Sequence, residues 1–223
     1  MAKISTTTTT PTETPAPFGS DRNIRVGAPF LAAAALFVSR DVARYYLTGV
    51  YIEPAKDGGA LLVATDGHRL IALRDPEGVC DKPFICAMPG VLRKFINEKN
   101  VGHIHFVGHR AEVTTSWGTL SDIVTAPPID DEYPDWRMTV LAKPTGSHVT
   151  FFNVVGTSIG DFARAAKIMN GGVGVGLTIT SLGNEKSPLM VTAETAHGPL
   201  FGIQAQTTWG PGQPSSIPDW IAK

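Results

Sequence analysis

The acid Asp66 and the base His68 stand two residues apart around Gly67, and such a pair could transfer a proton. The same three residues, however, separate two apolar runs at 61–65 and 69–73. An Asp-Gly between two such runs is a strong signal for a β-hairpin turn. The turn accounts fully for the acid and the glycine, so we predict a hairpin here and no catalytic pair.

Three histidines, His103, His105 and His109, could supply imidazole ligands to a metal ion. The first two fall on one face of a predicted strand at 101–107. His109 falls in a turn, and the spacing matches no zinc pattern. We therefore predict histidines on the surface of a strand, and an enzyme that uses this strand is the least favoured of the functions considered below.

Two further segments resemble ligand sites in composition only. Residues 171–176 are as rich in glycine as a phosphate loop, but they follow a predicted helix and precede a strand, which is the reverse order. The acidic run at 130–132 could bind a hard cation, and a solvated loop explains it better. The sequence thus predicts no catalytic residue, no metal and no cofactor.

Basic residues gather on the segments predicted to be helices. If the helices share one side of the molecule, that side carries a positive stripe, although the formal net charge of the chain is only -1. An ordinary set of solvated helix faces explains the same residues equally well. The residues are Arg40, Arg93, Lys94, Lys99, Arg164 and Lys167.

The elements that position these residues repeat three times, from about Ile24, in the order strand, helix and three strands. The helices are expected to begin at Pro29, at Pro89 and at a capping box formed by Ser158 and Asp161. Short turns between consecutive strands predict antiparallel sheets, and hence an α+β fold. The expected strands include 45–52, 61–65 and 69–73 in the first unit, 84–87, 101–107, 111–115 and 119–125 in the second, and 148–153, 177–180, 189–194 and 200–206 in the third.

Composition and patterning divide the 223 residues into ordered and tail segments. An apolar content of 43% allows a real core, and the absence of a run of eighteen apolar residues excludes a membrane span. Cys80 and Cys86 are too few for a disulfide scaffold and indicate a reducing cytoplasm. We predict a Thr/Pro-rich mobile tail at 1–23 that is not a signal peptide, a two-unit domain at 24–128, a connector at 129–145, a partial domain of one unit at 146–209 and a tail at 210–223.

Two motifs resemble the middle domain of the bacterial DNA polymerase III beta subunit, the sliding clamp. One is Arg44–Val50 followed by Val63–Leu70, and the other is residues 133–137, which read Tyr-Pro-Asp-Trp-Arg. Residues 89–96 and 161–166 resemble the second helix of that domain and the first helix of the last domain. The resemblance covers residues 25 to about 170, and only the pattern continues beyond them.

The resemblance implies a DNA-clamp fold, with sheets outside and helices inside a ring that encircles duplex DNA. It implies an accessory subunit without chemistry, which assembles with copies of itself in the cytoplasm of a bacterial or phage-infected cell. It assigns sequence-independent DNA contacts to Arg40, Arg93, Lys94, Arg164 and Lys167. It assigns an apolar pocket for short peptides of the replicative polymerase and the clamp loader to Leu47, Thr65, Gly67, His68, Arg69, Leu70 and Pro134.

The chain departs from the family pattern in ways that leave alternatives open. A family ring holds twelve units, so three units per chain would need four chains, and two whole domains per chain would need three. Met138 and Thr139 replace the basic and branched pocket residues of the family, and its C-terminal pocket wall is expected to be absent. The tail residues Ile217 and Trp220 could occupy the pocket themselves. The alternative function is an interaction module that binds clamp partners or a host clamp without encircling DNA.

Overall fold

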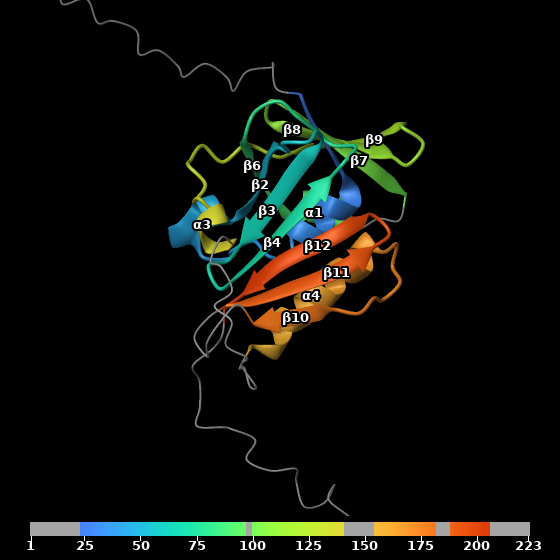
Figure 1. Cartoon of the computed structure of the whole chain (residues 1–223). Helices are drawn as coiled ribbons and strands as arrows, with labels where there is room; N and C mark the ends of the chain where they lie inside the picture. Colours follow the sequence, from blue (N-terminus) through green and yellow to red (C-terminus); the bar gives the residue numbers. More distant parts are fainter. Residues whose placement is uncertain (1–22, 97–99, 141–153, 182–187, 206–223) are drawn as a thin grey trace, which may run out of the picture.

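The computed structural model describes residues 23–96, 100–140, 154–181 and 188–205, which form two antiparallel sheets and a set of short helices (Figure 1). The α+β prediction is therefore confirmed. In chain order the elements are β1 (Ile24–Gly27), α1 (Ala28–Ala34), the 3-10 helix η1 (Val42–Leu47), β2 (Gly49–Pro54), β3 (Ala60–Thr65), β4 (Arg69–Asp75), β5 (Val79–Cys80), β6 (Phe84–Ala87), α2 (Gly90–Phe95), β7 (Val101–Val107), β8 (Arg110–Thr115), β9 (Leu120–Thr125), α3 (Arg137–Val140), α4 (Gly156–Met169), β10 (Thr178–Ser181), β11 (Leu189–Thr195) and β12 (Gly198–Gln204).

The first two repeats exchange their first strands. The five-stranded sheet has the order β5-β1-β7-β8-β9, so β1 of the first unit lies in the sheet of the second. In return, β6 of the second unit pairs with β2 of the first. The two units thus share both of their sheets. The strand expected at 148–153 in the third unit lies outside the described residues.

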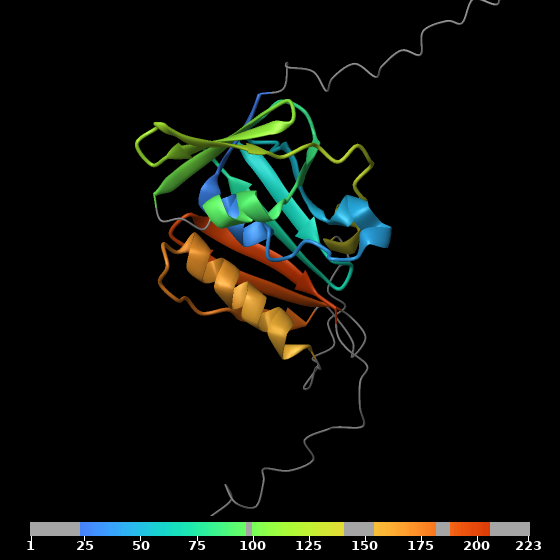
Figure 2. The ribbon, with the colours of Figure 1, turned by 180° about the vertical axis from the view of Figure 1, so that it is seen from behind.

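The third unit extends the sheet of the first. The larger sheet has the order β10-β11-β12-β4-β3-β2-β6, and β12 pairs with β4 from Leu200 opposite Leu73 to Gln204 opposite Arg69. Figure 1 shows this sheet in front of α4, and Figure 2 shows α1, α2 and α4 in front of the strands on the opposite side. The helices therefore share one side of the molecule. No helix of the described part is long and apolar enough to cross a bilayer.

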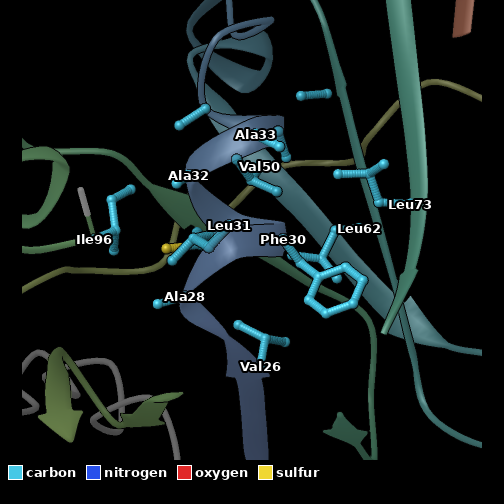
Figure 3. Close-up of a cluster of buried hydrophobic side chains, with 14 of the residues drawn as sticks. Val26, Ala28, Phe30, Leu31, Ala32, Ala33, Val50, Leu62, Leu73 and Ile96 are labelled. Carbon is cyan, nitrogen blue, oxygen red and sulfur yellow. The ribbon is translucent and has the colours of Figure 1, made fainter. Parts of the chain in front are cut away.

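The first helix packs closely because most of its side chains are small. Pro29 opens α1, as its fixed φ allows, and the alanines that follow Leu31 are buried. Phe30 and Leu31 complete a core that includes Leu62 and Leu73 of the sheet (Figure 3). The α4 side chain of Phe162 adds to this core, with its ring centroid 4.6 Å from that of Phe37. A single buried cluster thus joins helices and strands of all three units.

Two local predictions are wrong. The strand predicted at 45–52 begins only at Gly49, because Asp41 accepts a hydrogen bond from the Ala43 amide and caps η1 across Tyr45–Leu47. The capping box at Ser158 does not form, since α4 begins two residues earlier, at Gly156, and has no side-chain cap. The predicted stop of this helix is confirmed, with Gly171 and Gly172 at positive φ.

The close approach of Phe162 to β12 gives a stability prediction. A Cβ at Gly202 would overlap the Phe162 ring, so Gly202→Ala is expected to lower the free energy of unfolding by about 1–3 kcal/mol. Gly160→Ala is the control, because its Cβ would meet nothing on the exposed side of α4, and it should stabilise the protein by about 0.5–1 kcal/mol. Urea denaturation measures both. Equal effects at the two positions would contradict this packing.

Candidate functional site

A hollow of about 420 Å³ lies beside the β3–β4 hairpin, between the first and the third unit. All seven residues expected at a peptide pocket line it: Leu47, Thr65, Gly67, His68, Arg69, Leu70 and Pro134. Six further lining residues were not predicted: Tyr133, Asp135, Trp136, Pro188, Ile203 and Ala205. We refer to this hollow as the hairpin pocket.

The hairpin that forms one wall is fixed by its own side chains. Asp66 Oδ1 accepts hydrogen bonds from the amides of His68 and Arg69, at 2.9 and 3.0 Å. The Thr65 hydroxyl accepts from the Gly67 amide at 3.0 Å and donates to the Arg69 carbonyl at 2.7 Å. Among the residues of this turn, only Gly67 has positive φ, at 89°. Asp66 therefore serves the turn, as its sequence context predicted, and His68 is left exposed at the edge of the pocket.

The floor of the pocket is apolar and buried. Leu47, Leu70 and Ile203 belong to one buried cluster with Tyr133, whose ring stacks on Tyr51 at a centroid distance of 4.7 Å and an interplanar angle of 3°. Burial raises the pKa of the Tyr133 phenol, so this ring stays neutral at physiological pH. The floor can therefore accept an apolar side chain.

The rim beside Tyr133 is held by an ion pair. Arg137 donates from its two terminal nitrogens to Glu53, at 2.6 and 3.3 Å, and its guanidinium lies 4.4 Å from the centroid of the Trp136 ring. The hydrogen bond to Glu53 raises the pKa of Arg137. This bidentate contact stabilises the segment that carries Pro134 and Trp136 at the pocket.

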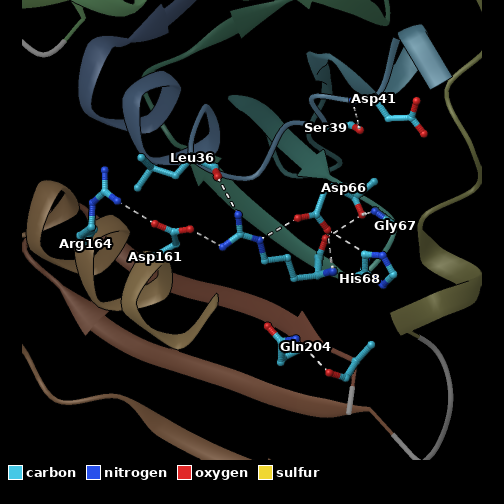
Figure 4. Close-up of polar contacts among 12 residues, drawn as sticks. Leu36, Ser39, Asp41, Asp66, Gly67, His68, Asp161, Arg164 and Gln204 are labelled. Atoms are coloured by element: carbon cyan, nitrogen blue, oxygen red, sulfur yellow. Dashed lines mark hydrogen bonds and ion pairs between the residues drawn. The ribbon is translucent and has the colours of Figure 1, made fainter. Parts of the chain in front are cut away.

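Arg69 is the polar centre of the site. Its side chain is only 13% exposed. The guanidinium donates to Asp66 on the hairpin at 2.9 Å, to the Leu36 carbonyl at 3.2 Å and to Asp161 on α4 (Figure 4). Burial alone would lower the pKa of Arg69, but the hydrogen bonds to Asp161 and Asp66 outweigh it and raise this pKa. One cation thus connects the hairpin, the segment after α1, and α4.

The third unit supplies the wall opposite the hairpin. Ile203 and Ala205, at the end of β12, and Pro188, before β11, line the pocket. The amide of Ala205 donates to the His68 carbonyl at 2.7 Å and fixes this wall to the hairpin. The third unit thus walls the pocket on this side, whereas the C-terminal segment in which the family carries its own pocket wall lies outside the described residues. The apolar run of β12 can be seen in the sequence, but only the β4–β12 pairing shows that this run reaches the pocket.

The helix side carries fewer free charges than the sequence predicted. Arg40, Lys94 and Lys167 are exposed and take part in no ion pair found among the described residues. Arg164 is exposed, but it pairs with Asp161 at 2.9 Å. The expectation that Arg93 is solvated is wrong.

Arg93 is half-buried and donates to the carbonyls of Met88 and Ala35, at 3.0 and 2.9 Å. Burial and the neighbouring charge of Arg40 lower the pKa of Arg93. Its main contacts are therefore within the fold. Lys99 lies outside the described residues.

The histidines of β7 do not come together. His105 Nδ1 lies 3.7 Å from Glu112, on the neighbouring strand, whereas His103 lines a different cavity near the start of α1. His109 lies in the turn before β8. This geometry agrees with histidines that belong to the surface of a strand. The thiols of Cys80 and Cys86 donate to the carbonyls of Lys82 and Ala87, and burial raises the pKa of Cys86.

The chain has the fold of the DNA sliding clamps. It aligns with the DNA polymerase III beta subunit of Thermotoga maritima with a TM-score of 0.51 and 16% identity, over 90% of this chain and 68% of that one. The alignment with the sliding clamp of Pseudomonas aeruginosa bound to griselimycin has a TM-score of 0.49 and 14% identity, and it covers 89% of this chain and 68% of that one. The alignment with the sliding clamp of Bartonella birtlesii bound to griselimycin has a TM-score of 0.42 and 22% identity, and it covers 86% of this chain and 53% of that one.

The chain therefore spans between about half and two thirds of the length of the clamps that it matches. No protein-family model and no curated protein matches its sequence.

The contacts of Arg69 predict a large effect on stability. Arg69→Ala would leave the mostly buried Asp66 without its cation and Asp161 with the exposed Arg164 alone, so the free energy of unfolding should fall by about 2–4 kcal/mol, somewhat less than for a fully buried pair. Arg44→Ala is the matched control. Arg44 pairs with Asp41, three residues away as Asp66 is from Arg69, but the two side chains are 39% and 45% exposed. That variant should lose no more than about 1 kcal/mol. Urea denaturation of both variants tests the difference, and losses of the same size would contradict the central place of Arg69.

Proposed function

We propose that the protein is a clamp-like accessory factor of DNA replication. It holds short peptides of the replicative polymerase and the clamp loader in the hairpin pocket, and it contacts duplex DNA through the helix side. It performs no chemistry itself and acts in the cytoplasm of a bacterial or phage-infected bacterial cell. The observation that carries the proposal is the hairpin pocket, in which the first unit and the connector bring all seven expected residues together.

The pocket has the size and the chemistry of a peptide site. Its volume of about 420 Å³ falls within the usual range for ligand pockets. Leu47, Leu70 and Ile203 offer an apolar floor, while exposed His68 and Asp135 offer polar groups at the edge. One apolar side chain buried on this floor would contribute about 1.5–3 kcal/mol, and the polar edge would fix the direction of the peptide.

The helix side suits weak DNA contacts. Arg40, Lys94 and Lys167 are exposed on or just beyond the helices, and phosphate contacts from such residues carry no sequence information. With a net charge of -1, the protein needs retention by another means than charge. A closed homo-oligomer of three or four copies that encircles the duplex would provide it.

One observation favours the alternative of an interaction module that does not encircle DNA. Arg93 and Arg164, two of the five cations expected to face DNA, make hydrogen bonds within the fold. Each would have to give up those bonds to reach a phosphate. A module that binds polymerase or loader peptides, or a host clamp, needs only the hairpin pocket.

Filling the pocket tests peptide binding. Ala205→Phe places a ring against the floor, so a fluorescent peptide from a bacterial replicative polymerase should bind about 10- to 100-fold more weakly, as expected when one apolar anchor is lost. Ala163→Phe, on the exposed side of α4, should leave binding unchanged. Fluorescence anisotropy measures both, with the full chain and with a chain ending at residue 210. Binding that appears only after truncation means that the tail occupies the pocket, and no binding to either chain would contradict the proposed peptide site.

Charge reversal tests DNA contact. Changing Arg40, Lys94 and Lys167 to Glu should weaken duplex binding and lower the slope of log affinity against log salt by about 0.9 for each lost phosphate contact. Changing Lys56, Lys82 and Arg110 to Glu alters the net charge equally at exposed positions outside the helices, and should leave the slope nearly unchanged. Filter binding over a range of salt concentrations gives the slopes. If both triple variants show the same slope of log affinity against log salt, the DNA does not contact the helix side.

A further inference from the structure

We propose that the free edge of β9 pairs with β9 of a second copy of this chain, antiparallel and around a two-fold axis. The inference rests on the self-association within the proposed function and names the surface that performs it.

The fold already contains one pairing of this kind. The strands β4, β9 and β12 are equivalent, since each is the last strand of its unit and follows its neighbour through a short hairpin. Two of them, β4 and β12, pair with each other antiparallel over five residue pairs. The last strands of two units can therefore join their sheets into one. Of these three unit-ending strands, β9 alone lies at a sheet edge within the described residues.

The composition of β9 is that of a strand suited to pairing. Leu120 and Ile123 on this free strand are 53% and 48% exposed, so apolar surface remains available at the edge. Natural sheets usually protect such edges with lysine, proline or inward charges, and the sequence of β9 contains only one charged residue, Asp122. Ala72 and Phe201, which face each other on the side of the β4–β12 pair away from the helices, are partly buried. Ile123 lies on the same side of β9, because Val124 beside it faces the core, and a partner strand would cover it in the same way.

A second copy is the partner that fits, because continuity with the β4–β12 interface requires another last strand of this fold. A two-fold pairing centred on Ile123 places Asp122 opposite Val124 of the other copy, so the two Asp122 carboxylates do not face each other directly. Such an interface is the same patch used twice. A closed ring that uses it must contain an even number of copies, which selects the tetramer over the trimer.

Cysteine cross-linking tests the pairing in the full chain. In a Cys80→Ser background, Ile123→Cys should give a covalent dimer on mild oxidation, because the two thiols meet at the axis, whereas buried Cys86 stays unreactive. Val42→Cys, at a residue 85% exposed on η1, is the control and should stay monomeric on a non-reducing gel. Equal cross-linking at both positions, or none at position 123, would overturn the proposal.

Sedimentation equilibrium gives an independent measurement that needs no cross-link. Ile123→Lys should halve the mass of the assembly at a given concentration, and Val42→Lys should leave it unchanged. A wild-type chain that stays monomeric at high concentration and low salt, or an Ile123→Lys variant of unchanged mass, would refute the β9 contact. Peptide affinity at the hairpin pocket should be the same for both variants, so a failure of the pocket and a failure of this interface give different results.

Discussion

The guanidinium group of Arg69 is the interaction on which the arrangement of the candidate site depends. It meets a carboxylate of the hairpin, a carbonyl after α1 and a carboxylate of α4, and it lies 4.9 Å from the centroid of the Phe37 ring. A planar group with five donors can serve three acceptors in different directions, which an ammonium group on a flexible stem does poorly. The choice of arginine thus fixes the position of the third unit against the first, together with the β4–β12 ladder.

The pocket and the helix side are two faces of the same junction. Asp161 accepts hydrogen bonds from Arg69, which lines the pocket, and from Arg164, which lies on the helix side. A single carboxylate therefore separates a pocket residue from a residue expected to face DNA. A phosphate that attracted Arg164 would leave Asp161 to Arg69 alone, so occupancy on one side changes the electrostatic balance on the other.

Local signals in the sequence predicted most of the fold, and contacts between distant segments account for what they missed. The Asp66-Gly67 turn, the strands beside it and the glycine stop after α4 follow from neighbouring residues, and these predictions hold. The pocket residues came from a family resemblance and lie together as that resemblance implied. The interior contacts of Arg93 and the wall formed by Ile203 depend on tertiary packing, which charge and periodicity do not report. The helix η1 shows the same limit at short range, since one cap outweighed the strand propensity of Tyr45–Leu47.

The exchange of β1 and β6 between the first two units has a consequence for the origin of the fold. Each unit completes its sheet with a strand that belongs to the other, so neither could bury its own edge if the chain were cut between them. A chain holding only one such unit would gain the same closure by pairing with a copy of itself and trading first strands. The two-unit domain is therefore what gene fusion would produce from a strand-swapped dimer, with the linker between the units converting a concentration-dependent assembly into a single cooperative folding unit.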